Sequence, residues 1–174
     1  PPRRPPDLDV AHFPQSSNRL EPLELDSNAF TRLPEVLSNM PRLKRLSLAG
    51  NQLKLTEQTL AKLNRLRTLW YLNLSNNPLG ATPDVSLMSN LRRLLLRDTG
   101  LTELPEGLNN CAHIEWIDLR ENEIKELPDW LFQKTRRFTE ALNLGLNPFN
   151  ETTKTYLDNY RKNFGIGMGY TADD

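Results

Sequence analysis

The chain has almost no cysteine. Cys111 is the single thiol among 174 residues, and one thiol excludes an internal disulfide framework and a metal site built from clustered cysteines. An excess of charge is missing too, because 22 Lys and Arg residues balance 22 Asp and Glu residues. A neutral chain gives no electrostatic reason to expect a nucleic acid or an anionic membrane as its partner.

Long apolar runs are also absent from the sequence. Mean hydropathy is −0.60, and no apolar run approaches the roughly 20 residues that span a membrane. The N-terminal stretch PPRRPPDLDV contains neither an initiator Met nor the apolar segment of a signal peptide. We therefore expect a fragment of a longer protein, long enough to form one domain with a core. These features leave the localisation open.

Leucine at fixed intervals is what the sequence has instead. The pattern L-x-x-L-x-L-x-x-N-x-L, with some substitutions, is the leucine-rich-repeat signature. It predicts an α/β solenoid of about six repeats, with a concave parallel sheet and short helices or 3-10 turns on the convex side. The matching windows are residues 20–30, 43–53, 69–79, 91–101, 114–124 and 139–149.

The positions of the repeat predict which side chains form the core. Positions 1, 4, 6 and 11 are apolar and should stack on their equivalents in the next repeat, because one repeat cannot bury this face alone. Position 9 is Asn in five repeats and Thr99 in the fourth. An Asn amide donates twice and accepts at its oxygen, whereas a Thr hydroxyl donates once. We therefore expect a column of Asn that joins successive turns and a looser turn at Thr99, costing about 1 kcal/mol.

Other segments predict the helices and the ends of the solenoid. Leu-Pro at 33–34, 104–105 and 127–128 favours short helical turns, and residues 55–66 have apolar residues at helical spacing. Residues 150–165 read as a capping helix between Asn150 and Gly165, and the apolar face predicted for it is Tyr156, Leu157, Tyr160 and Phe164. The expected domains are a Pro-rich segment with a partial cap at 1–19, repeats at 20–149, the capping helix at 150–165 and a tail or linker at 166–174.

No residue pattern supports catalysis. Cys111 ends a return segment, so a buried structural thiol is favoured over a reactive pair with His113. His12 and His113 lie about four repeats apart and cannot share a metal. We therefore expect no enzyme within this chain, no cofactor and no metal.

A solenoid offers its concave sheet as a binding surface. Positions 2, 3, 5, 7 and 8 of each repeat should face outward there. In the middle repeats these positions combine aromatic and Arg side chains, which are enriched at interface hot spots. The alternative is that the aromatics only pack on the stems of the Arg side chains. A nucleic acid could use the same residue types, but the interleaved acids disfavour it. The predicted partner-binding residues are Arg45, Trp70, Tyr71, Asn73, Arg93, Leu95, Arg97, Trp116, Asp118 and Arg120.

Four stretches carry a closer resemblance, LRTLWYLNLSNNPLG, LRRLLLRDTGLTELPEGL, IDLRENEIKELP and LNLGLNPF with YLDNYRKNFGIGMG. Over roughly residues 20 to 169 the sequence resembles the leucine-rich-repeat region of bacterial NEL-type (IpaH/SspH-like) ubiquitin-ligase effectors, which often carry a dermonecrotic-toxin-like region. The catalytic Cys of that family lies in a Cys-x-Asp motif of a separate NEL domain. Here Ala112 and His113 follow Cys111, so no catalytic role carries over to this thiol.

Two functions remain open from the sequence. The first is a protein-binding module that, as the resemblance implies, recruits a substrate for ubiquitin transfer within a virulence effector delivered into a host cell. The second is an intramolecular regulatory, autoinhibitory region that docks on an adjacent enzymatic domain.

Overall fold

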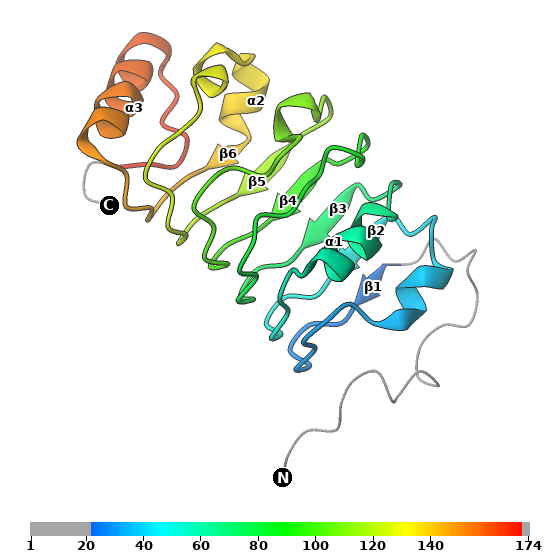
Figure 1. Cartoon of the computed structure of the whole chain (residues 1–174). Helices are drawn as coiled ribbons and strands as arrows, with labels where there is room; N and C mark the ends of the chain where they lie inside the picture. The colour runs from blue at the N-terminus through cyan, green and yellow to red at the C-terminus, as the bar shows by residue number, and fades with distance from the viewer. Residues whose placement is uncertain (1–21, 172–174) are drawn as a thin grey trace.

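The structure, a computed structural model, describes residues 22–171. It is a solenoid built on one parallel sheet, whose strands lie side by side in chain order, as Figure 1 shows. The predicted fold is thereby confirmed, whereas the segment predicted at 1–19 lies outside the described residues. The strands are β1 (Leu23–Glu24), β2 (Arg45–Ser47), β3 (Tyr71–Asn73), β4 (Arg93–Leu95), β5 (Trp116–Asp118) and β6 (Leu142–Asn143).

Short helices return the chain from one strand to the next. The 3-10 helices are η3 (Glu35–Asn39), η4 (Leu108–Asn110) and η5 (Asp129–Gln133), and they follow the three Leu-Pro pairs as predicted. Helix α1 (Glu57–Asn64) confirms the longer helix expected in the second repeat. Sequence reasoning missed α2 (Arg136–Glu140), which is short and whose N-cap is Thr135. Helix α3 (Glu151–Phe164) closes the C-terminal end.

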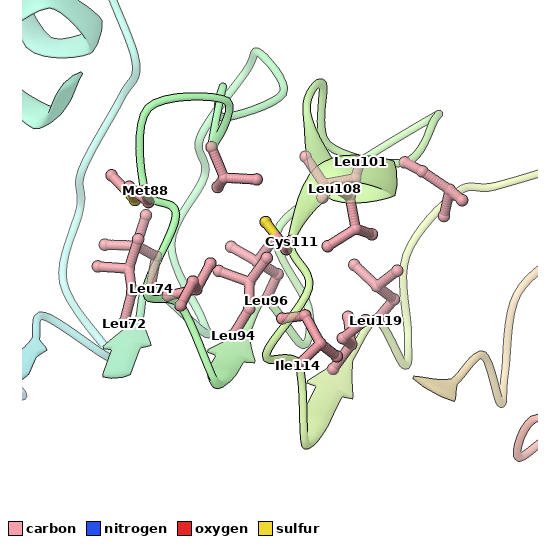
Figure 2. Close-up of a cluster of buried hydrophobic side chains, with 14 of the residues drawn as sticks. Leu72, Leu74, Met88, Leu94, Leu96, Leu101, Leu108, Cys111, Ile114 and Leu119 are labelled. Atoms are coloured by element: carbon pink, nitrogen blue, oxygen red, sulfur yellow. The ribbon is translucent and has the colours of Figure 1, made fainter. Parts of the chain in front are cut away.

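The core consists of the predicted repeat positions. Every described residue at positions 1, 4, 6 and 11 is buried, and Thr139 is the one polar residue among them. Residues from the return segments complete the core, and Figure 2 shows Met88, Leu108 and Cys111 beside the strand leucines. Cys111 is only 4% exposed, which confirms the prediction of a buried structural thiol.

The Asn column joins the turns as expected. Asn51 Nδ2 donates to the Leu25 and Leu48 carbonyl oxygens at 2.9 and 2.8 Å, one in the preceding repeat and one in its own. Its Oδ1 accepts from the backbone amide of Phe30 at 3.1 Å. Asn77, Asn122 and Asn147 repeat this arrangement. These buried bends are therefore satisfied by side chains, as backbone polar groups out of water require.

The C-terminal cap differs from the prediction at its end. Asn150 and Gly165 do bound α3, with Asn150 Oδ1 accepting from the Thr153 amide and Gly165 in the left-handed conformation. On the predicted apolar face, Leu157 and Tyr160 are buried, whereas Tyr156 and Phe164 are 56% and 52% exposed. Tyr156 meets Phe132 and Phe164 meets Tyr160, with ring centroids 5.9 and 4.7 Å apart.

The segment after α3 is an irregular but packed cap, whereas the sequence predicts a tail or linker there. Ile166, Met168 and Tyr170 are buried, and the Met168 carbonyl oxygen accepts from the Leu144 amide at 2.8 Å. In Figure 1 this red segment returns beside β6. Residues 166–171 thus provide a backbone acceptor next to β6. The last strand of a sheet would otherwise present unpaired backbone polar groups at its edge. Residues 172–174 lie outside the described chain.

Candidate partner-binding surface

Strand register aligns the predicted surface residues in rows. Position 3 pairs Arg45 with Tyr71, Tyr71 with Arg93, and Arg93 with Trp116 across successive strands. Position 5 runs in a second row through Asn73, Leu95 and Asp118. The structure therefore brings the predicted residues of the middle repeats into one region of the concave sheet, as the pattern required.

Arg45, Trp70 and Tyr71 form a stack of their own. The Arg45 guanidinium carbon lies 5.1 Å from the Trp70 ring centroid and 4.8 Å from that of Tyr71, and the two rings meet edge to face at 6.1 Å. All three side chains are half-buried. Part of each side chain is therefore used in cation–π contact and packing within the fold. This packing is what the alternative to partner binding predicts from the sequence.

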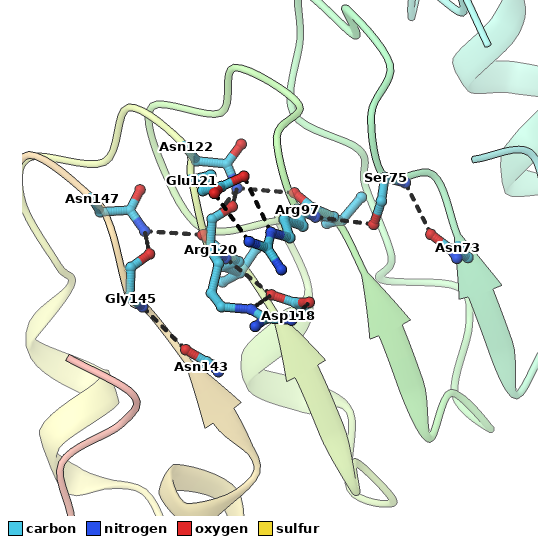
Figure 3. Close-up of polar contacts among 12 residues, drawn as sticks. Asn73, Ser75, Arg97, Asp118, Arg120, Glu121, Asn122, Asn143, Gly145 and Asn147 are labelled. Atoms are coloured by element: carbon cyan, nitrogen blue, oxygen red, sulfur yellow. Dashed lines mark hydrogen bonds and ion pairs between the residues drawn. The ribbon is translucent and has the colours of Figure 1, made fainter. Parts of the chain in front are cut away.

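Two side chains at position 5 accept hydrogen bonds from backbone amides. This corrects the expectation that the position-5 side chains all face outward without partners. Asn73 Oδ1 accepts from the Ser75 amide at 3.0 Å and Asp118 Oδ1 from the Arg120 amide at 3.1 Å. Asp118 is only 4% exposed. Figure 3 shows these contacts, together with the matching bond from the Gly145 amide to Asn143 Oδ1. These carboxamide and carboxylate oxygens are occupied by the chain itself.

The Asn column explains why position 5 is needed there. In a continuing parallel ladder, the amide at position 7 would bond the carbonyl at position 6 of the preceding strand. The Asn side chain at position 9 takes that carbonyl, so the amide requires another acceptor. Where the side chain at position 5 does not accept from this amide, a side chain of the preceding repeat is the acceptor. Ser75 Oγ accepts from the Arg97 amide at 3.1 Å, and Asp26 Oδ1 from the Ala49 amide at 2.9 Å.

Two of the predicted arginines are held in ion pairs. Arg120 Nη2 lies 2.7 Å from Asp118 Oδ2, and this hydrogen bond raises the pKa of Arg120. Arg97 Nε and Nη2 donate to the Glu121 carboxylate at 3.1 and 3.0 Å. That contact lowers the pKa of Glu121 and raises the pKa of Arg97. The Arg97–Glu121 pair lies near solvent, so it orients the side chains more than it stabilises the fold.

Arg93, Leu95 and Trp116 remain available. Trp116 is 39% exposed, Arg93 is exposed and Leu95 is half-buried. Within residues 22–171, neither Arg93 nor Trp116 makes a side-chain hydrogen bond, ion pair or ring contact. Trp116 lies across from the Arg93 backbone in the ladder, and its neighbour on the far side is the small, buried Ala141. We refer to these three residues as the concave patch.

A second feature was missed by the repeat reading. A hollow of about 400 Å³ lies where β2 to β4 begin, beside the concave patch. The repeat pattern predicts position 2 to face outward, but it makes no prediction for the residues that precede each strand. A count of bases in those segments would have found it. The lining residues, called the basic hollow below, are Lys44, Thr68, Trp70, Asn90, Arg92 and His113.

The chemistry of Cys111 opposes a catalytic role. Burial raises the pKa of this thiol to about 11, so the nucleophilic thiolate is disfavoured at neutral pH. Its Sγ lies 3.6 Å from the Gly107 carbonyl oxygen. His113 is exposed and lines the basic hollow instead. No cluster of His, Cys, Asp or Glu among the described residues is arranged to hold a metal ion.

None of the helices within residues 22–171 has the length and apolarity to cross a bilayer.

Comparison with known proteins decides the family of the repeats. The Leucine Rich Repeat family profile matches residues 68–89. The chain carries leucine-rich repeats. The chain is 31% identical to Receptor like protein 28 of Arabidopsis thaliana over 140 aligned residues. The alignment covers 78% of this chain and 18% of that protein. A leucine-rich-repeat-containing protein of Schizosaccharomyces pombe is 29% identical over 141 residues, covering 81% and 19%.

Solved structures agree on the fold. A leucine-rich-repeat protein of Leptospira interrogans superimposes with a TM-score of 0.67 at 24% identity, covering 86% of this chain and 42% of that one. The BIR2 ectodomain of Arabidopsis thaliana gives a TM-score of 0.57 at 22% identity, covering 72% and 66%. The leucine-rich-repeat chain spans under a fifth of the length of the two sequence relatives. Leucine-rich repeats are generally non-catalytic, protein-binding modules.

Proposed function

We propose that this chain binds a partner protein through the concave patch. The observation that carries the proposal is Trp116, a large aromatic side chain 39% exposed on a concave sheet. The fold needs no aromatic at position 3, because Arg93 occupies that position in the preceding repeat and pairs with Trp116 in the same ladder. Trp and Arg side chains beside an apolar residue are the composition of interface hot spots.

Site-specific crosslinking tests this surface. A photoreactive amino acid at position 116, with a second variant at the exposed convex residue Asn110, is introduced into the full-length protein in its native cells. A partner captured from position 116 but not from position 110 is then purified. Its affinity is measured for Trp116→Ala with Arg93→Ala, and truncation of a hot-spot pair should weaken binding by about tenfold or more. Equal capture from both positions, or unchanged affinity with an intact thermal midpoint, contradicts the proposal.

The finer proposal concerns the parent protein. Resemblance to NEL-type effectors supports a role in selecting the substrate of a bacterial ubiquitin ligase, with the transferring Cys outside this chain. A ubiquitin-transfer assay of the full-length protein with the captured partner tests it. Ubiquitin should appear on that partner with the wild-type protein and not with Trp116→Ala plus Arg93→Ala. Absence of any transferase activity in the full-length protein contradicts this finer proposal and leaves partner binding intact.

An exposed aromatic cluster favours a second function, intramolecular regulation. Tyr156 and Phe164 are largely exposed at the C-terminal cap, and Phe132 lies 5.9 Å from the Tyr156 ring. Such a patch at the end of a solenoid suits contact with an adjacent domain. Tyr156→Ser plus Phe164→Ser should raise the activity of the full-length protein if the contact is autoinhibitory. Unchanged activity, with unchanged hydrogen exchange in the adjacent domain, contradicts it.

A further inference from the structure

Basic and acidic side chains are separated along the strands although the chain as a whole is neutral. The segments that lead into β2, β3 and β4 are residues 41–45, 65–71 and 90–93, and they contain no Asp or Glu. Acids follow the strands instead, as at Asp98 and Glu121. Although the net charge is zero, the electrostatic potential should therefore be positive where β2, β3 and β4 begin. The bases in the leading segments are Arg42, Lys44, Arg45, Arg65, Arg67, Arg92 and Arg93.

The basic hollow lies within this edge, and its two cationic side chains, Lys44 and Arg92, are unpaired within residues 22–171. Lys44, Arg92 and His113 are exposed, and within the described residues none of their side chains forms a hydrogen bond or an ion pair. At the same repeat position, Glu115 follows Arg92 by one repeat and makes no ion pair with it, whereas Glu21, one repeat before Lys44, lies outside the described residues. The hollow therefore offers cationic donors that no carboxylate within residues 22–171 neutralises.

Trp70 gives the hollow an apolar wall. The Arg45 guanidinium and Tyr71 hold its indole in place, so the ring needs no further ordering when a ligand arrives. An ordered Trp between two bases provides contact area for a side-chain stem or a peptide plane. The Arg92 guanidinium can engage a carboxylate with two parallel hydrogen bonds.

We propose that the basic hollow binds carboxylate side chains of an acidic peptide segment on the protein partner. The proposal rests on the proposed function and extends it to a second contact beside the concave patch. A hollow of about 400 Å³ has room for side chains but not for a folded surface. Asp98, Glu121 and Glu123 lie across the sheet and would repel an extended polyanion such as a nucleic acid, whereas a short acidic segment at one edge avoids them.

The test uses a fluorescein-labelled oligoglutamate peptide and an uncharged Gly-Ser peptide of equal length. Fluorescence anisotropy with the whole chain should show binding of oligoglutamate alone, weakening as salt is added. Lys44→Glu plus Arg92→Glu should reduce affinity by about tenfold or more. The matched control is Lys125→Glu plus Lys162→Glu, which makes the same change in net charge at exposed sites away from the hollow and should bind as wild type. Lys44→Gln plus Arg92→Gln gives a milder loss, and thermal midpoints confirm folding.

Several outcomes overturn the proposal. They are no binding of oligoglutamate at low salt, an equal loss in hollow and control variants, and binding of phosphatidylserine vesicles or oligouridylate in place of oligoglutamate. Trp116→Ala should retain oligoglutamate binding. Loss of partner binding by Trp116→Ala and loss of oligoglutamate binding by the hollow variants are therefore separate results, so failure of one proposal is distinguishable from failure of the other.

Discussion

Leu146 occupies a backbone conformation that suits other residue types. Position 8 has a positive φ in every described repeat, from 53° to 69°. Glycine and short polar residues tolerate this left-handed region, whereas a branched apolar side chain is strained there. Leu146 has a φ of 59° and is 51% exposed, so burial of its side chain compensates little. The residues at this position are Ser27, Gly50, Asn76, Asp98, Glu121 and Leu146.

Leu146→Asn should therefore stabilise the chain by about 0.5–1 kcal/mol. Chemical unfolding of the two proteins measures the difference. Leu146→Ala is the control, because Ala keeps the Cβ that makes this conformation costly. An equal gain from Ala would assign the effect to loss of an exposed apolar side chain instead.

Cys111 makes stability depend on alkaline pH. Its pKa is raised to about 11 in the folded protein, from 9.0 for an ordinary thiol. Below pH 9 the thiol is protonated in both states, so this contribution is fully present. Between pH 9 and 11 only the unfolded chain releases the proton, and stability falls. The loss approaches about 2–3 kcal/mol at pH 11.

Cys111→Ala isolates this effect from the titration of Lys and Tyr residues. The variant is less stable at pH 8 because of the cavity left in the core. The free-energy gap between wild type and variant should then narrow as the pH rises from 9 to 11 in urea unfolding series. A gap that stays constant over that interval would show that burial does not perturb the thiol.

Residues 166–171 form an irregular segment that packs as a unit against the last repeat. Gly169 has a φ of 71°, and a Cβ at this position would collide with the side chain of Asn143. Arg161 stacks 5.9 Å from the Tyr170 ring and donates to the Tyr170 carbonyl oxygen. Tyr170 in turn meets Phe149 edge to face at 5.7 Å. The segment is therefore tied to the sheet, to α3 and to the last repeat.

A chain that ends after Gly165 should lose about 4 kcal/mol of stability, because three buried side chains contribute at least ~1.5 kcal/mol each and area-based values are upper estimates. A chain that ends after Thr171 keeps those side chains and serves as the control. Calorimetry compares the two, and size-exclusion chromatography reports association through the exposed edge of β6. Coincident unfolding midpoints would rule out the capping role.

Thr99 interrupts the hydrogen bonding that runs through the whole solenoid. The carbonyl oxygens of Leu25, Leu48, Leu96 and Leu119 each accept from two position-9 side chains, one in the same repeat and one in the next. Leu74 accepts only from Asn77, at 2.9 Å. The single Thr99 hydroxyl faces Leu96 O at 2.8 Å and Asn122 Oδ1 at 3.0 Å, so it reaches no acceptor in the third repeat.

Thr99→Asn should add about 1 kcal/mol by donating to Leu74 O, whereas the Leu79 amide already donates to Asn77 O at 2.9 Å. Thr99 lines an open hollow with Asn77 and Pro78, so the longer side chain has room. Because repeats couple only to their neighbours, hydrogen exchange should show β1–β3 opening more cooperatively with β4–β6 in this variant. Thr99→Val, which loses the bond to Leu96 O, is the opposing control and should destabilise. Destabilisation by Asn would refute the missing-bridge account.

Much of the architecture follows from the sequence because the repeat is local. Each leucine at positions 4 and 6 points inward by strand alternation, and each Asn at position 9 serves a bend of fixed geometry. The six repeats, the core positions, α1 and both ends of α3 were therefore predictable. The outward row of Arg45, Tyr71, Arg93 and Trp116 followed from the same register, although its role in binding stays a prediction.

Contacts between repeats, and between the repeats and their cap, depended on the tertiary structure. Asp118 and Asn73 read as free surface, but the Asn column displaces the position-7 amides and these side chains must accept from them. Residues 166–171 read as a linker, because nothing in their composition shows that the last sheet edge needs a partner. Lys44, Trp70, Arg92 and His113 come from separate repeats, and only stacking gathers them into one hollow. The sequence by itself determined what each repeat buries, whereas packing of neighbouring repeats decided which polar groups remain free to bind.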